Sequence, residues 1–202
     1  EVWDYSRGML STYAQEGPNI TKRHMPPGCA RALDYHAEPK SISERDEEHI
    51  GFLGAFFQRS PEVRGVLARS GRLELAQARN HAATLITQSA WQEYLRRLPM
   101  QLNLHTVLNP LGAFESFRVS VLLANKACVY SGTSHPLDEE LWQGMVRFVN
   151  ESDVLESLEP LWGNTAAITE CQEQQHQRFC ERLNPKRILE ESGFLEKLVE
   201  LR

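Results

Sequence analysis

The sequence lacks an apolar run long enough to cross a membrane. A membrane-spanning helix needs about 20 consecutive apolar residues, and the longest apolar stretches, around 50–57 and 119–123, are much shorter. The first residues are acidic and aromatic, without the basic and apolar regions of a secretory signal. The sequence therefore predicts an intracellular protein, cytoplasmic or nuclear, with a secreted protein as the alternative.

Closely spaced cysteine pairs, which bind zinc or catalyse thiol exchange, are also absent. None of the four cysteines belongs to a Cys-x-x-Cys pair; they stand at positions 29, 128, 171 and 180. We therefore expect four reduced thiols, as is usual inside cells. Triplets that fit the N-glycosylation pattern begin at Asn19 and Asn150 and favour the other possibility, a secreted helical protein with disulfides.

The short motifs that identify common catalytic sites are missing as well. The sequence contains no Gly-x-Ser-x-Gly and no His-Glu-x-x-His, and its 12 glycines are too dispersed for a phosphate-binding loop. These absences predict a protein that is not an enzyme and that carries no cofactor.

The sequence also lacks an excess of positive charge. The formal net charge is −5 and the isoelectric point is about 5.8, which argues against a general nucleic-acid binder. Basic clusters occur at 22–24, 96–97 and 186–187, but each is short and none is interleaved with aromatic residues that could stack on bases. Nucleic acid is therefore not an expected partner.

The residues that are present favour helices. Hydrophobic residues make up 41% of the chain and charged residues 24%, as in ordinary globular domains. Ser60-Pro61-Glu62 and His135-Pro136 are typical helix starts, and apolar residues recur at helical spacing through 111–129. Residues 165–183 are predicted to form a helix that is polar on most sides. The sequence predicts an all-α fold, an irregular bundle of about nine helices.

One stretch does not suit this prediction. Residues 100–105 alternate between apolar and polar side chains, which is typical of a β-strand. No second alternating run exists for it to pair with, and an isolated strand leaves its backbone groups without partners. We therefore interpret the stretch as an extended connector between helices.

Two regions are expected within a single compact domain. Residues 1–42 are predicted to form an N-terminal helix followed by an irregular arm rich in proline, and residues 43–202 a helical domain. Such an arm is unusual inside a compact domain and is often ordered by a partner. The chain ends suggest that this domain is part of a larger polypeptide.

These features lead to a functional hypothesis based on protein contacts. The sequence predicts a non-enzymatic helical module that binds other proteins or acts as a scaffold. Trp3 and Trp162 lie near a chain end and in a loop, where exposed tryptophans would suit a protein interface. They are the expected partner-binding residues.

The rival hypothesis is an α-helical enzyme, or a ligand- or metal-binding protein, with its site in the helical core. Asp46 and His49 are three residues apart, and so are Glu173 and His176. Such pairs on facing helices are found in metal-binding bundles. No bridging glutamates stand at matching positions, so a metal site is only the weaker alternative.

Overall fold

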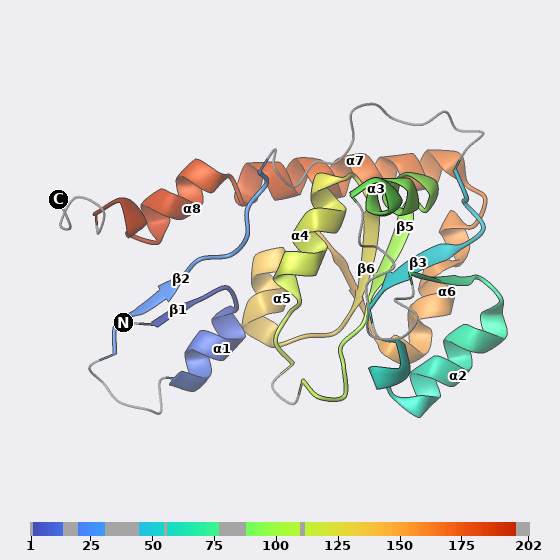
Figure 1. Ribbon diagram of the computed structural model, residues 1–202, viewed down its shortest axis with the longest axis horizontal. Coiled ribbons are helices and arrows are strands. Elements are labelled where there is room, and N and C mark those ends of the chain that lie inside the picture. Colours follow the sequence, from blue (N-terminus) through green and yellow to red (C-terminus); the bar gives the residue numbers. More distant parts are fainter. Residues whose placement is uncertain are drawn as a thin grey trace.

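A parallel five-stranded sheet forms the centre of the protein, whose computed structural model describes residues 2–13, 20–30, 45–54, 56–76, 88–109 and 112–196 (Figure 1). The prediction of an all-α bundle is therefore wrong. The strand order is β4-β3-β5-β6-β7, and all neighbours run parallel. The five strands of the sheet are β3 (Ile50–Leu53), β4 (Leu73–Ala76), β5 (Met100–Asn103), β6 (Cys128–Gly132) and β7 (Arg147–Val149).

The central strands are buried on both faces, as parallel strands usually are. Every residue of β5 and of β6 is buried. In register, Met100 lies opposite Cys128 and Ile50 lies opposite Leu73. The stretch at 100–105 therefore has strand partners on both sides, and its interpretation as a connector is wrong.

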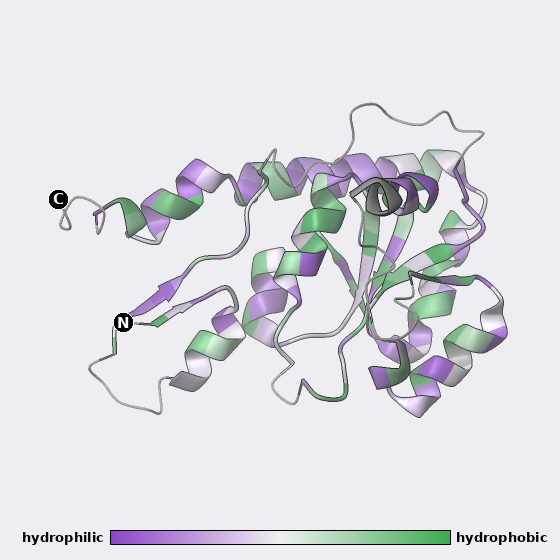
Figure 2. Cartoon of the chain, viewed as in Figure 1, coloured by the Kyte–Doolittle hydropathy of each residue, from purple (hydrophilic) through white to green (hydrophobic). Residues whose placement is uncertain are grey.

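Helices cover both faces of this sheet, and hydrophobic residues concentrate between the layers (Figure 2). One apolar cluster joins α3, α4 and α5 to β6, and the other joins α2 and α6 to β3 and β5. The helices around the sheet are α2 (Pro61–Ser70), α3 (Gln88–Arg97), α4 (Ser116–Ala124), α5 (Pro136–Trp142), α6 (Val154–Leu158), α7 (Thr165–Arg182) and α8 (Pro185–Glu191), with 3-10 turns η4 (Phe56–Gln58), η6 (Glu151–Asp153) and η7 (Glu159–Leu161).

Several predicted helix starts are confirmed by their capping contacts. The Ser60 hydroxyl accepts a hydrogen bond from the backbone N–H of Val63 at the start of α2. His135 caps α5 in the same way, and α7 occupies the predicted polar helix almost residue for residue. None of the described helices is long and apolar enough to cross a membrane.

The N-terminal residues form a small separate unit beside the sheet (Figure 1). It contains β1 (Val2–Asp4), α1 (Arg7–Thr12) and β2 (Lys22–His24), with β1 and β2 parallel. The predicted helix is therefore only the part after β1, and the predicted irregular arm contains a strand. The boundary expected between residues 42 and 43 lies outside the described residues.

Two disulfides bind other elements to α7. Cys128 of β6 is bonded to Cys171, and Cys29, which follows β2, is bonded to Cys180. The expectation of four reduced thiols is therefore wrong. The second disulfide connects residues that are 151 positions apart and joins the N-terminal unit to the sheet domain.

Candidate functional site

The topology of the sheet indicates where a ligand would bind. The chain passes from β3 to β4 on one side and then returns to place β5 on the other side of β3. In open parallel sheets, ligands bind at the carboxyl ends of the strands where the order reverses in this way. That position lies here between the segments that follow β3 and β5.

Two arginine side chains converge beside Gly54, which directly follows β3. A methyl group at Gly54 would lie 3.3 Å from Nη2 of Arg59 and 3.6 Å from Nη2 of Arg118. Burial lowers the pKa of both guanidinium groups, and the charge of Arg118 lowers that of Arg59 further. Like charges held together in a buried place are typical of a site that binds an anion.

Asn103 holds the surrounding polar groups together at the end of β5. Its side chain is fully buried, and its Oδ1 accepts a hydrogen bond of 2.9 Å from Nη1 of Arg118. Its Nδ2 donates to Oε2 of Glu115 at 3.1 Å and to the Ser131 hydroxyl at 2.9 Å. One amide thus links β5 with β6 and with the start of α4.

Glu115 and His105 form a close pair next to this amide. Nδ1 of His105 lies 2.8 Å from Oε2 of Glu115. Burial would raise the pKa of Glu115, but His105, Arg118 and Asn103 together outweigh it and hold the pKa below its usual value. Nε2 of His105 is buried and has no hydrogen-bond partner among the described residues. A buried nitrogen without a partner is unusual in a folded protein.

Glu151, which follows β7, brings a second carboxylate to the same edge. Burial raises its pKa, while the charges of His105 and Arg59 and a hydrogen bond to the His105 backbone act in the opposite direction. A methyl group at Gly132 would lie 3.0 Å from Oε1 of Glu151, so this carboxylate rests against the end of β6. The edge therefore carries two arginines, two glutamates and one histidine.

The opposite pKa shifts of the two glutamates predict opposite pH profiles of stability. Because the pKa of Glu151 is raised on folding, wild type loses stability as the pH rises from 4.5 through the raised value. Because the pKa of Glu115 is lowered, wild type loses stability as the pH falls from 4.5 through the lowered value. Glu151→Gln and Glu115→Gln each remove one of these contributions.

Urea unfolding between about pH 3 and pH 7 measures both effects. Relative to wild type, Glu151→Gln is expected to gain stability as the pH rises, and Glu115→Gln to lose it. Each variant serves as the control for the other, since both exchange a carboxylate for an amide. Parallel profiles for the two variants would contradict the charge arrangement.

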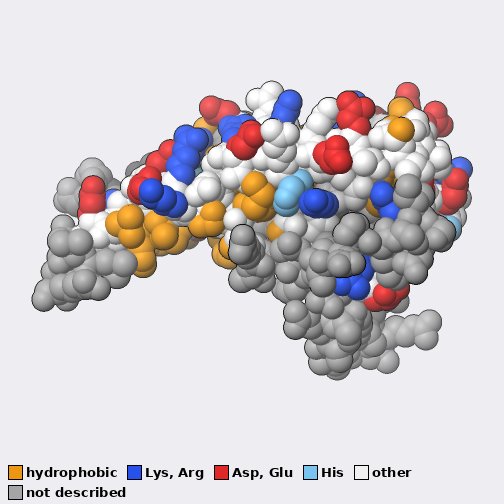
Figure 3. All heavy atoms as spheres, turned by 90° about the horizontal axis from the view of Figure 1, so that it is seen from above, with side chains coloured by type: hydrophobic (Ala, Val, Ile, Leu, Met, Phe, Trp, Pro, Cys, Tyr) orange, Lys and Arg blue, Asp and Glu red, His pale blue; other side chains and the backbone are white. Residues whose placement is uncertain are grey.

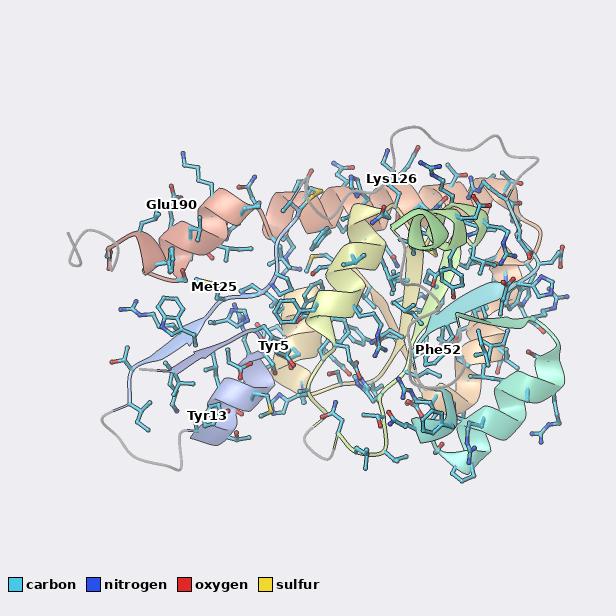
Figure 4. The ribbon with its side chains drawn as sticks, in the orientation of Figure 1. Tyr5, Tyr13, Met25, Phe52, Lys126 and Glu190 are labelled. Carbon is cyan, nitrogen blue, oxygen red and sulfur yellow. A yellow bond between two sulfur atoms is a disulfide. The ribbon has the colours of Figure 1, made fainter. Side chains whose placement is uncertain are left out.

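Tyr5 of the N-terminal unit, labelled in Figure 4, lies against the first turn of α4. The Tyr5 ring packs edge-on against Phe117, with ring centres 4.9 Å apart. Burial raises the pKa of the Tyr5 hydroxyl, and the negative charges of Asp4, Glu115 and Asp138 raise it further. The unit therefore contributes one aromatic side chain beside the polar cluster.

Comparison with solved structures identifies the fold. A sucrose-phosphate synthase from Thermosynechococcus elongatus matches with a TM-score of 0.64 and 11% identity, over 99% of this chain and 58% of that one. WaaG, a glycosyltransferase involved in lipopolysaccharide biosynthesis, matches with a TM-score of 0.58 and 9% identity, over 95% of this chain and 62% of that one. The chain shares their α/β fold. It spans about six tenths of the length of each protein.

These matches also correct the functional hypothesis. The chain has the fold of these enzymes, so the prediction of a non-enzymatic helical interaction module or scaffold is wrong. The rival hypothesis of an α-helical enzyme or ligand-binding protein is wrong in its fold class. No protein-family model and no curated protein sequence matches the chain.

The two tryptophans predicted to bind partners lie far apart and contact their own chain. Trp3 is 37% exposed, and its ring centre lies 5.9 Å from that of Phe194 and 5.7 Å from the Arg23 guanidinium. Trp162 is partly buried, with the Arg72 guanidinium 4.8 Å from its ring centre. Their role in partner binding stays a prediction.

The four residues of the weaker metal hypothesis are not brought together in one cluster. Nδ1 of His49 lies 2.9 Å from Oδ1 of Asp46, before β3. On α7, Glu173 is exposed, and Nδ1 of His176 lies 2.8 Å from the carbonyl oxygen of Leu123. Within the described ranges, no group of three or more His, Cys, Asp or Glu side chains could hold a metal ion.

Sequence reasoning missed every residue of the polar cluster. One signal was available, because the alternating stretch at 100–105 contains both Asn103 and His105 at its end. Taken as a parallel strand, it would have placed these two side chains at the carboxyl edge of a sheet, where ligands bind. Arg59, Arg118 and Glu151 follow no motif, and only the fold brings them there.

Proposed function

We propose that the chain is the donor-binding part of a glycosyltransferase, which moves a sugar from a phosphate leaving group to an acceptor hydroxyl. The observation that carries this proposal is the convergence of Arg59 and Arg118 on Gly54 where the strand order reverses. Guanidinium groups match phosphate oxygens in geometry and charge. The fold shared with a glycosyltransferase supports the same reading.

In the proposed reaction, the bond between the anomeric carbon of the sugar and the phosphate oxygen breaks. The electron pair stays on the phosphate oxygen, where Arg59 and Arg118 stabilise the charge that develops. The acceptor oxygen forms the new bond to carbon, and its proton passes to the departing phosphate group. Fixed positive groups aimed at developing charge are usually the largest contribution to such catalysis.

Other side chains at this edge position these groups. The Asn103 amide orients Arg118 through its 2.9 Å hydrogen bond. Glu115 pairs with Nδ1 of His105, which leaves Nε2 of the ring to contact the donor. Ionised Glu115 thus positions His105 and Asn103, and we assign it no proton transfer.

Binding of nucleoside diphosphate sugars, measured by calorimetry on this chain, tests the proposal. Gly54→Ala would place a methyl group tightly against Nη2 of Arg59 and in contact with Nη2 of Arg118, and we expect it to weaken donor binding about tenfold. Gly71→Ala is the matched control, because Gly71 also has a positive φ, of +66°, but has no atom within 4 Å of the added methyl group. Like Gly54→Ala, it places alanine at a positive φ, but it leaves the arginines in place.

Saturable binding that Gly54→Ala weakens and Gly71→Ala preserves would support the proposal. The proposal fails if no member of a broad panel of nucleoside diphosphate sugars binds the wild-type chain. It fails equally if both glycine variants weaken binding to the same degree.

The two disulfides support a further part of this proposal, that the protein works in an oxidising compartment. Disulfides persist mainly in secreted and extracytoplasmic proteins. Protein isolated from its natural source without reductant is expected to gain about 4 Da on reduction, one hydrogen for each of four sulfurs. Four thiols that react with an alkylating agent before reduction would contradict this location.

A further inference from the structure

A polar cavity lies between the N-terminal unit and α8. Its volume is about 370 Å³, which is within the usual size of small-molecule sites. None of its lining residues belongs to the polar cluster around Gly54. Six basic or imidazole side chains line it, namely Arg7, Lys22, Arg23, His24, Arg182 and Arg187.

The charge of this cavity runs against that of the whole chain. Five lining side chains are Lys or Arg, and Glu191 is the only acid among the lining residues. The complete chain has a net charge of −5. The outer surface of α7 and α8 instead carries acidic and basic side chains in mixture (Figure 3). Positive charge is therefore concentrated inside the cavity.

Two basic clusters that are far apart in the sequence contribute to this concentration. Lys22-Arg23-His24 forms β2, and Arg187 belongs to the Lys186-Arg187 pair at the start of α8. Lys186 takes no part, because its side chain is 83% exposed and pairs with Glu190. Glu190 lies on the side of α8 away from β2 (Figure 4).

Several of the cavity's cations are fixed by contacts with the walls. Nη1 of Arg23 donates to the Ser192 carbonyl oxygen at 3.0 Å, and Nη1 of Arg182 donates to the Gln143 carbonyl oxygen at 3.0 Å. Arg187 is bonded through Nε to Oε1 of Glu191 at 2.5 Å. A guanidinium group has five N–H donors, so the contacts of Arg182 and Arg187 orient these two groups without occupying every donor.

Arg7 and Lys22 differ from these three. Their side chains have no hydrogen bond or ion pair within the described part of the chain. His24 lies near Arg7, and burial and the charge of Arg7 both lower its pKa, which favours the neutral imidazole. Among the described residues, neither of these two cations that line the cavity is paired with an acid.

We propose that this cavity binds a phosphate monoester, either on a small soluble molecule or on a lipid headgroup. A dianionic phosphate with three terminal oxygens can accept hydrogen bonds from several guanidinium and ammonium groups at once. A carboxylate carries half that charge and would leave most of the cations unmatched. The site is independent of the proposed donor site, so either proposal can fail while the other holds.

Calorimetric titration with glucose 6-phosphate tests the soluble form of the ligand. Arg7→Gln with Lys22→Gln removes the two unmatched cations, and we expect binding to weaken at least tenfold. Lys186→Gln is the matched control, because it removes one exposed cation of the same helix from outside the cavity. Glu191→Gln removes the cavity's acid and is expected to tighten binding several-fold.

Co-sedimentation with phosphatidic acid vesicles tests the lipid form with the same variants. If the double variant weakens binding in only one of the two assays, the phosphate source used in that assay is supported. The proposal is overturned if neither probe binds, or if Lys186→Gln weakens binding as much as the double variant. If the double variant does not fold, Glu191→Gln alone tests the proposal. Unchanged or weaker binding of the phosphate probe by Glu191→Gln would contradict it. Binding to polynucleotide but to neither probe contradicts it as well.

Discussion

Arg118→Ala is expected to lower the kcat/KM for sugar transfer by about 1,000-fold in the intact protein, with the fold retained. The side chain combines a charge beside Gly54 with a hydrogen bond to Asn103. Its removal takes away one of the two guanidinium charges that converge beside Gly54, which the proposed function places on the leaving phosphate. It also leaves Oδ1 of Asn103 without this donor, at a cost to stability of about 1–2 kcal/mol.

Two further variants show whether the loss of activity is specific to the Arg118 guanidinium. Arg118→Lys keeps the charge and is expected to retain part of the activity, because an ammonium group cannot reproduce the planar guanidinium contacts. Arg69→Ala, on the exposed side of α2, removes an arginine of the same protein from outside the site. A loss of less than about threefold in Arg118→Ala, or an equal loss in Arg69→Ala, would refute the assignment.

Asp138→Ala is expected to reduce the free energy of unfolding by about 3–5 kcal/mol, which is the largest stability effect we predict. Asp138 is 1% exposed and joins α5 to the N-terminal unit. Its carboxylate accepts hydrogen bonds from the Ser6 hydroxyl at 2.6 Å and from the backbone N–H groups of Arg7 at 2.7 Å, Gly8 at 3.3 Å and Phe114 at 3.3 Å. Alanine would leave these four donors without a partner.

Urea unfolding monitored by tryptophan fluorescence measures this loss. Asp138→Asn should fall between wild type and Asp138→Ala, because an amide has one acceptor oxygen where the carboxylate has two. Glu140→Ala, on the exposed side of the same helix, is the control and should change stability by less than about 0.5 kcal/mol. A cost below about 1 kcal/mol for Asp138→Ala would show that the N-terminal unit does not depend on this carboxylate.

The helix starts could be predicted from the sequence because capping is local chemistry. Ser60 and Asn184 are each followed by proline, which suits the first helical position and sets the backbone angle there. Both residues cap their helices through the side chain, as do His135 and Asn164. The residues that decide such a boundary lie within four positions of one another.

The sheet could not be predicted in the same way because its strands are short and buried on both faces. Ile50-Gly51-Phe52-Leu53 and Cys128-Val129-Tyr130-Ser131-Gly132 show no alternation of polar and apolar residues. Next to helical segments, such apolar runs continue the spacing of a helix, so the helical spacing predicted through 111–129 extends into the first two residues of β6. Only the outcome of long-range pairing distinguishes the two structures.

The same reason hid the candidate site. Its five charged or titratable side chains come from four segments between residues 59 and 151, and none is part of a motif. A single alternating stretch ending in Asn103 and His105 carried the signal. The alternation alone does not identify a strand here, because the strands that pair with this stretch do not alternate.

A crystal structure of the chain with a bound nucleoside diphosphate sugar tests the central claim most directly. We predict that the phosphate oxygens lie within hydrogen-bond distance of Arg59 and Arg118, over Gly54, with the sugar directed toward His105. A diphosphate bound elsewhere on the chain, with Arg59 and Arg118 contacting only protein groups, would contradict the claim.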